Sequence, residues 1–396
     1  MTSIEQSYPG RLYPRLAILA VGLFAVATNG FMIAGILPSI ASTLGVHASD
    51  VSYSITWYSI TVAVAAPLIS ILFPRMSRTT LMAGGRVLVA LGTLLAAAAP
   101  TLLLFTLGRV LAGLGGAAIV PAATAAAAAL APEERRGRAI AFVAVGFTAS
   151  TAFGAPLGTA LAAAGGWRLP LLGLAVLAVI VAVAVAVFVR GIPVAEPISV
   201  ARRFGVLANH RRALALAATL LGVAGFNVVY IFSSAVTQHA TGGDGALLAA
   251  LLLVFGVSGI AGNLVSGRLI DRFGSRRTAA LAFGVQVAVM LALPFVSASF
   301  AGTAILFALW GVSANASLLP VQHRLIGIDP PTSGVALSWY STALYAGISI
   351  APLLGAAALH LGGGGLVPLV GALAAALGLL AFQLSWAGRR TRPALA

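Results

Sequence analysis

Arg109 carries the clearest chemical signal in this sequence, because it lies inside a largely apolar stretch, residues 102–126. A charged side chain at the centre of a bilayer costs roughly 2.5 to 3.5 kcal/mol on insertion scales, so an arginine there is seldom incidental. Its guanidinium could bind an anionic substrate group or pair with backbone carbonyls freed near helix breaks. The alternative is an arginine that extends its charged end to the membrane surface.

Amide and aromatic side chains in other apolar stretches form a second set of candidates. They offer hydrogen bonds and flat apolar surfaces to a substrate without requiring that it carry a charge. The alternatives are bonds between helices for the amides and an interfacial belt for Trp and Tyr, which we favour for Trp57 and Trp167. The residues predicted to line a substrate cavity with Arg109 are Asn29, Phe31, Tyr58, Phe226, Asn227, Tyr230, Trp310, Asn315, Trp339 and Tyr340.

The residue types that catalysis or metal binding would need are absent or scattered. The sequence has no cysteine, which excludes thiolate metal sites and a cysteine nucleophile. It shows no cluster of metal ligands, no phosphate-binding loop after a strand and no pair of embedded carboxylates. We therefore predict that the protein is not an enzyme, has no catalytic residues, and uses neither a metal ion nor an organic cofactor.

All eight acidic residues fall in predicted loops or termini. A carrier that exchanges its substrate for protons needs a group whose protonation competes with the substrate, most simply an embedded Asp or Glu. Histidine could take this part, since its ordinary pKa is about 6.5. His323 is the best placed of the five histidines, with a plain polar residue at a helix end as the alternative.

The composition is that of a protein embedded in lipid. Hydrophobic residues make up 60% of the chain and charged residues 8%, and the mean hydropathy is +1.05. A run of about twenty apolar residues can cross the roughly 30 Å of hydrocarbon in a bilayer. Such runs are predicted near residues 16–38, 52–73, 80–99, 102–126, 139–164, 167–189, 213–236, 245–270, 278–297, 301–323, 334–360 and 365–387.

The charges predict how these segments are oriented. The chain has a formal net charge of +15, and its 23 basic residues are all arginine. Arg109 lies within a segment and Arg168 on one side of the membrane, so the remaining arginines share the opposite side, including Arg86 and Arg324 at predicted helix ends. By the positive-inside rule, both termini and the central linker face the cytoplasm. The arginines therefore indicate topology, and no nucleic-acid partner is expected.

The two halves of the chain resemble each other. The stretch that ends at Arg75 aligns with the one that ends at Arg272, about half the chain later. Internal duplication is typical of transporters in which two bundles move about a site at the membrane midplane. We predict an all-α membrane protein of twelve transmembrane helices in two pseudo-symmetric six-helix bundles, residues 1–190 and 213–396. The linker, 191–212, is predicted to be an amphipathic connector on the membrane surface, with a disordered tether as the alternative.

Several motifs carry a resemblance to the major facilitator superfamily. Residues 267–277 read GRLIDRFGSRR, similar to the family's loop motif, in which glycine permits close helix approach and Asp and Arg tie helix ends together. Residues 107–116 are similar to its intramembrane arginine motif, and residues 154–158 to its antiporter motif. The resemblance implies a role in conformational switching for Arg75, Arg78, Gly154, Pro156, Gly158, Gly267, Asp271, Arg272 and Gly274.

The order and spacing of these motifs are most similar to those of bacterial drug and sugar efflux antiporters, the arabinose-efflux-like permeases. The resemblance implies a monomeric secondary carrier of the inner membrane. It would export a small molecule, a sugar-like compound or a drug, by alternating access in exchange for protons. Gly30 stands where such permeases often carry an acid, and Ser70 and Pro74 replace the family's Gly and Asp. The alternatives are an uncoupled facilitator and a non-transporting membrane sensor derived from a carrier.

Overall fold

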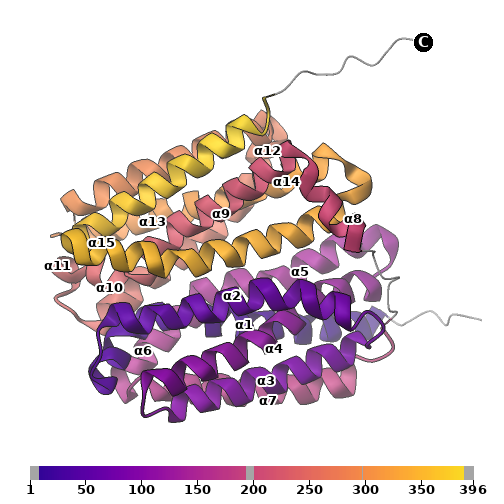
Figure 1. Cartoon of the computed structure of the whole chain (residues 1–396), viewed down its shortest axis with the longest axis horizontal. Helices are drawn as coiled ribbons and strands as arrows, with labels where there is room; N and C mark the ends of the chain where they lie inside the picture. Colours follow the sequence, from indigo (N-terminus) through magenta and orange to yellow (C-terminus); the bar gives the residue numbers. More distant parts are fainter. Residues whose placement is uncertain (1–8, 193–199, 297, 388–396) are drawn as a thin grey trace, which may run out of the picture.

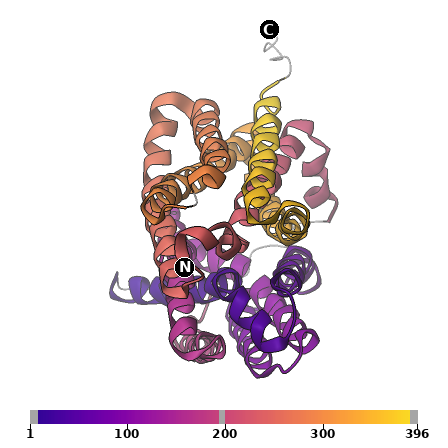
Figure 2. The same ribbon diagram turned by 90° about the vertical axis from the view of Figure 1, so that its left-hand side faces the viewer.

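The helices of this protein are apolar on nearly all sides, as expected where one side meets lipid and the other meets neighbouring helices. The computed structural model describes residues 9–192, 200–296 and 298–387, and these residues form helices, turns and loops without strands. Part of the predicted linker, 193–199, lies outside the described residues. Figure 1 shows α1 to α7 grouped in one half of the molecule and α9 to α15 in the other, and Figure 2 shows the same division from the side.

The first half contains six membrane-spanning segments built from the earlier elements. These are α1 (Pro9–Leu44), α2 (Ala48–Leu72), α3 (Arg78–Ala98), α4 (Leu102–Leu130), η1 (Glu133–Arg135), α5 (Arg136–Ala149), the π-helix η2 (Ser150–Gly154), α6 (Ala155–Gly165) and α7 (Arg168–Phe188).

The later elements begin with the short helix that follows the linker. They are α8 (Val200–Gly205), η3 (Val206–Ala208), α9 (His210–Ile231), α10 (Ser233–Val236), α11 (Gln238–Thr241), α12 (Gly245–Val296), α13 (Phe300–Ala316), α14 (Leu318–Ile328), η4 (Pro330–Thr332) and α15 (Ser333–Leu384).

Ten helical segments of the described residues are long and apolar enough to cross a membrane. Two of them, α12 and α15, are 52 residues long and contain a break, at Gly274 (φ 77°) and at Gly363 (φ 67°). Glycine adopts this left-handed backbone at little cost. Each of these two helices therefore supplies two spans, so the described residues form the predicted twelve spans. The prediction of a twelve-helix membrane fold is confirmed, while the domain limits at residues 190 and 213 stay predictions.

Prolines interrupt two spans that the hydropathy predicts as continuous. In segment 139–164, the π-helix η2 precedes Pro156. In a regular helix the ring of Pro156 would clash with the carbonyl of Ala152, and the wider π-helical turn avoids this clash. In segment 301–323, α13 ends before Pro320, which leaves the carbonyl of Ala316 without its helical partner. The hydroxyl of Ser266 donates to this carbonyl at 2.8 Å. A neighbouring helix thus satisfies the backbone group inside the membrane.

Glycines let helix backbones approach each other closely within each half. A Cβ at Gly92 of α3 would overlap the backbone of Ala112 in α4, and one at Gly108 would come within 2.6 Å of backbone atoms of α3. In the second half, a Cβ at Gly225 of α9 would lie 2.7 Å from the carbonyl oxygen of Gly371 in α15. Packing of small residues is a main source of helix association in lipid, where no hydrophobic force acts between helices.

The two halves contact each other mainly along α2 with α15 and along α6 with α12. We call the end of the molecule that carries α8 the linker end and the opposite end the distal end. On the distal side of the centre, the Thr56 hydroxyl donates to the carbonyl of Ser349 at 2.8 Å. Close to the distal tip, a Cβ at Gly245 would lie 3.2 Å from the Cβ of Ala163. The distal side of the interface is therefore closed in this structure.

At the linker end, α8 connects the two halves. The Arg203 guanidinium donates to the Ser70 hydroxyl of α2 at 2.7 Å, and the Trp339 indole of α15 donates to the Arg203 carbonyl at 2.9 Å. Phe204 packs edge to face on Trp339, with ring centroids 5.3 Å apart. Among the described linker residues, this short helix thus packs against protein, and the predicted placement on the membrane surface stays a prediction.

Candidate substrate site

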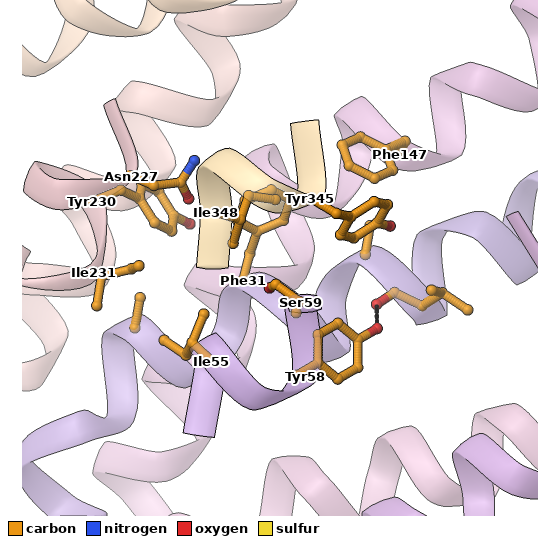
Figure 3. Close-up of a pocket in the computed structure, with 14 residues that line it drawn as sticks. Phe31, Ile55, Tyr58, Ser59, Phe147, Asn227, Tyr230, Ile231, Tyr345 and Ile348 are labelled. Carbon is orange, nitrogen blue, oxygen red and sulfur yellow. Dashed lines mark hydrogen bonds between the residues drawn. The ribbon is translucent and has the colours of Figure 1, made fainter. Parts of the chain in front are cut away.

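A small enclosed cavity lies where the two halves meet. It is bounded by α1, α2 and α5 of the first half and by α9 and α15 of the second (Figure 3). Its volume is about 20 Å³, which is room for about one water molecule. An organic substrate therefore enters this position only after the two halves, or the side chains between them, have moved apart.

Aromatic rings surround the cavity and bridge the two halves. Phe31 of α1 makes edge-to-face contacts with Phe147 of α5 and Tyr230 of α9, each with ring centroids 5.8 Å apart. Tyr230 also contacts Phe255 of α12 at 5.4 Å and Phe226 of α9 at 6.3 Å. Such pairs contribute about 0.5 to 1.5 kcal/mol each beyond the burial of their area. The rings hold the cavity closed in this conformation.

Arg109 lies directly behind the wall of the cavity that Tyr58 forms. Its Nη1 donates to the backbone carbonyl of Asn29 at 2.8 Å and to the side-chain oxygen of Asn29. Its guanidinium carbon lies 4.3 Å from the centroid of the Tyr58 ring. The Asn29 amide donates to Thr93 at 2.6 Å, and the Tyr58 hydroxyl donates to the carbonyl of Val26 at 3.2 Å. Neutral protein groups therefore hold the cation.

The polar groups of the second half are bonded less completely. The Asn227 amide nitrogen donates to the carbonyl of Val223 at 2.8 Å, but its side-chain oxygen has no partner among the described residues. The hydroxyl of Tyr230, one turn further along α9, has no partner either. Both side chains line the cavity and are buried (Figure 3). An unmet buried polar group is costly, and in this conformation the described residues offer no partner to either atom.

The structure brings seven of the predicted cavity residues together. Phe31, Tyr58, Asn227 and Tyr230 line the cavity, while Asn29, Arg109 and Phe226 contact the residues that do. Trp310 belongs to the same aromatic cluster, with its ring 4.4 Å from that of Phe255. Whether these residues bind a substrate stays a prediction.

Three predicted residues lie away from the cavity. Asn315 donates to the carbonyl of Gly311 at 3.0 Å and packs against Gly259, whose missing side chain makes room for the amide. Trp339 and Tyr340 pack in the apolar cluster at the linker end. Tyr345 lines the cavity instead. Because it follows Tyr340 by five residues, it points about 140° away from Tyr340 around the helix, so both residues cannot face the same cavity.

The prediction that Arg86 flanks a helix end is wrong. Arg86 lies two turns inside α3 and is 2% exposed, with its guanidinium against Gly22 of α1, where any side chain would collide with it. Its Nη1 donates to the carbonyl of Met82 at 3.1 Å, while Nε and Nη2 have no partner among the described residues. Among the described side chains of the first half, two arginines are therefore buried, Arg86 and Arg109. Hydropathy did not reveal that Arg86 is buried, because the predicted apolar segment begins only a few residues before it.

Trp167 is also placed differently from the prediction of an interfacial belt. It is 2% exposed and packs edge to face on Phe105, with ring centroids 5.8 Å apart. Arg168 lies over its ring at 4.3 Å and donates to the carbonyls of Ala97 and Ala99 at the end of α3. A cation at a helix C-terminus is favourable, so this pair closes the distal end of the first half.

The switch motifs from the family resemblance have distinct structural settings. A Cβ at Gly154 would collide with Thr28 of α1 and one at Gly158 with Met32, so the segment around Pro156 packs tightly on α1. Gly274 makes the break in α12. Gly267 is not at a close approach, since a Cβ there would meet only Leu319, at 4.0 Å.

The charged members of these motifs lie near the linker end. No ion pair of Asp271 with another described residue is found, and the expected tie between helix ends stays a prediction. Arg272 lies over the ring of Phe273 at 5.1 Å. Arg75 follows α2, and Arg78 begins α3. Their role in switching stays a prediction.

The acidic side chains that the structure describes all lie at helix ends or in loops. Asp50 accepts from the backbone N–H of His47 at the start of α2, and Asp244 from that of Ala246 at the start of α12. Asp329 pairs with Arg212 at 2.6 Å. Hydrogen bonds from Thr332 and Arg212 hold the pKa of Asp329 below its ordinary value, so this carboxyl stays ionised at neutral pH. The cavity has no carboxylate among its described lining residues.

Comparison with known proteins agrees with this architecture. The sequence profile of the Major Facilitator Superfamily matches residues 19–352. The chain is 31% identical over 375 residues to the inner membrane transport protein YdhP of Escherichia coli O157:H7, which covers 94% of this chain and 96% of that protein. It is 31% identical over 384 residues to a chloramphenicol resistance protein of Streptomyces lividans, with 93% and 95% covered.

The fold is also similar to that of a solved transporter. A crystal structure of the nucleoside transporter NupG superposes with a TM-score of 0.76 at 12% identity, over 94% of this chain and 100% of that chain. Together with the twelve spans and the cavity between two halves, these matches identify the chain as a multi-pass membrane transporter, not an enzyme, and it belongs to the major facilitator superfamily.

Proposed function

We propose that this transporter exports a small neutral organic compound across the bacterial inner membrane, as a monomer working by alternating access. The observation that carries the proposal is the enclosed aromatic cavity between the two halves, with two unmet hydrogen-bonding atoms in its wall. The arginine distribution supports an orientation in which the linker end and both termini face the cytoplasm. The likeness to a chloramphenicol resistance protein supports export of a drug-like compound.

The chemistry of the cavity defines what such a compound must offer. The Asn227 side-chain oxygen can accept a hydrogen bond, and the Tyr230 hydroxyl can donate one. A hydroxyl or amide on the substrate supplies both partners, and an apolar or aromatic body matches the surrounding rings. A drug-like molecule fits these walls, as does a sugar-like compound with an apolar face.

Proton antiport is the coupling that we propose, on the strength of the likeness to efflux carriers. An uncoupled facilitator is the second candidate, favoured by the surface placement of the described acids. A sensor that binds without transport is the third. The three differ in measurable flux, since an antiporter moves protons against substrate, a facilitator only equilibrates substrate, and a sensor moves neither.

The test uses purified protein in proteoliposomes that contain a pH-sensitive dye. Chloramphenicol, a nucleoside and a pentose are added in turn, and substrate uptake and internal pH are followed together. Substrate-driven pH change supports antiport. Uptake without pH change identifies a facilitator, and binding without uptake identifies a sensor. If none of the three compounds binds or moves, the substrate class proposed here is wrong.

Substitutions at the unmet atoms should weaken substrate recognition. We expect Asn227→Leu and Tyr230→Phe each to raise the KM for transport up to about tenfold, because a hydrogen bond contributes about 0.5 to 1.5 kcal/mol. Both variants keep the size of the side chain, so the aromatic cluster stays packed. Initial rates of uptake over a range of substrate concentrations measure the change.

Gln286→Leu is the matched control for these two variants. Gln286 is an amide of the same half, 1% exposed, whose side-chain atoms have no partner among the described residues, but it does not line the cavity. Its substitution should leave KM unchanged. A similar rise in KM for all three variants would show that the effect comes from general packing of the second half and not from recognition.

A further inference from the structure

The cavity combines two features that oppose each other: a cage of aromatic rings and a buried cation immediately behind it. Five of the lining side chains are aromatic, and each comes from a different helix (Figure 3). We infer that Arg109 is a specificity-determining residue that excludes cations from this cage, so that the compounds recognised are neutral aromatic molecules. The inference rests on the proposed function, because it assigns the substrate class of the same cavity.

Aromatic cages by themselves favour cations. The faces of Phe and Tyr rings carry negative potential, and several rings around one space are the usual recognition site for quaternary ammonium groups. Phe31, Phe147, Tyr230 and Tyr345 present this chemistry from both halves of the protein. Without another charge nearby, the cavity would suit a lipophilic cation at least as well as a neutral compound.

The charge of Arg109 is not neutralised by the protein around it. Arg109 is 1% exposed, and its bonding partners, the two oxygens of Asn29, are neutral. Its Nε and Nη2 have no partner among the described residues, and no ion pair to it is found there. The field of the guanidinium therefore reaches the cavity through the ring of Tyr58.

The distances make this field strong enough to decide selectivity. The guanidinium carbon lies 4.3 Å from the Tyr58 centroid, and a cation bound to that ring lies within about 6 Å of the centroid. The two charges are then at most about 10 Å apart. At an effective dielectric constant of about 20, their repulsion weakens binding of the cation by roughly tenfold or more.

The positive charge of Arg86 also disfavours a cation inside the protein. Its guanidinium lies against Gly22, which is seven residues before Asn29 and hence on nearly the same face of α1, two turns away. Its Nε and Nη2 also lack partners among the described residues. The first half thus contributes two buried positive charges, while the second-half residues that line the cavity, Asn227 and Tyr230 among them, are neutral.

The test compares two probes of nearly the same shape that differ in charge, 2-naphthylmethanol and the 2-naphthylmethylammonium ion. Their dissociation constants are measured on the purified full-length protein by isothermal titration calorimetry, and the ratio of the two constants is the readout. We expect the wild-type protein to prefer the alcohol by at least tenfold. Equal affinities, or no binding of the alcohol, would overturn the inference.

Three variants then separate charge from structure. Arg109→Gln removes the charge and should lower the preference for the alcohol at least fivefold, whereas Arg109→Lys keeps the charge and should retain the preference. Asn29→Asp places a carboxylate against the guanidinium and should admit the cation with Arg109 intact. A new salt bridge favours the folded state of this last variant, so it provides the answer even if Arg109→Gln does not fold.

Loss of affinity for both probes by the same factor in these variants would mean that Arg109 acts only through structure, and would overturn the inference. Binding is measured without transport, so the two proposals can fail separately. A wild-type protein that discriminates between the probes but shows no flux would contradict the proposed function alone. Flux of neutral compounds without discrimination would contradict the charge filter alone.

Discussion

Oxidation of the double variant Ala163→Cys/Gly245→Cys is expected to stop transport completely, and reduction is expected to restore it. A Cβ at Gly245 would lie 3.2 Å from that of Ala163, close to the spacing found in disulfides, so the bond can form with a small adjustment. It would join α6 of the first half to α12 of the second at the distal end. If the cavity exchanges between the two sides of the membrane, these helix ends must separate in every cycle.

The measurement is uptake into proteoliposomes before and after treatment with copper phenanthroline, and again after dithiothreitol. The sequence has no cysteine, so no disulfide can involve a residue other than the two introduced ones. The single variants Ala163→Cys and Gly245→Cys, oxidised in the same way, are the controls and should keep their activity. Full activity of the oxidised double variant, with the disulfide shown to be complete, would contradict a cycle in which the distal side opens.

Gly92→Ala is expected to destabilise the protein by about 1 to 3 kcal/mol, the usual cost of overpacking. The added methyl group would meet the backbone of α4 at Ala112 and at Gly108, where no flexible side chain can move aside. The two helices would have to separate along their length. Thermal unfolding in detergent, followed by intrinsic fluorescence, should show a melting temperature lower by several degrees.

Gly84→Ala is the control, because it makes the same change two turns earlier in the same helix. A Cβ at Gly84 meets nothing within 4 Å. Alanine is the better helix former by up to about 1 kcal/mol, so this variant should be as stable as the parent or slightly more so. Equal melting temperatures for the two variants would show that close contact between α3 and α4 does not limit stability.

Much of the architecture follows from the sequence by itself. The number of spans is set by residue-by-residue transfer free energies, which sum over about twenty positions and need no knowledge of neighbours. The breaks at Gly274 and Gly363 are equally local, since only glycine adopts their backbone angles readily. Arg109 could be recognised for the same reason, because apolar residues surround it on both sides in the chain.

Other features depend on which side of a helix faces inward. Tyr345 and not Tyr340 lines the cavity, although hydropathy treats them alike. Trp167 is buried against Phe105, where a membrane-interface position was expected. The prolines in the sequence indicate where helices are interrupted. Only the fold shows that the Ser266 hydroxyl donates a hydrogen bond to the carbonyl that Pro320 leaves without a helical partner.

Asn29 and Asn227 also show which features follow from the sequence and which depend on the fold. The sequence determined that an amide occurs at a corresponding position of each half, and that an arginine lies inside the membrane. The packing of the helices shows that the Asn29 side chain is hydrogen-bonded to Arg109 and Thr93, whereas the side-chain oxygen of Asn227 has no partner among the described residues. The reason is that hydrogen bonds between helices depend on contacts between residues far apart in the chain, which local hydropathy and spacing do not encode.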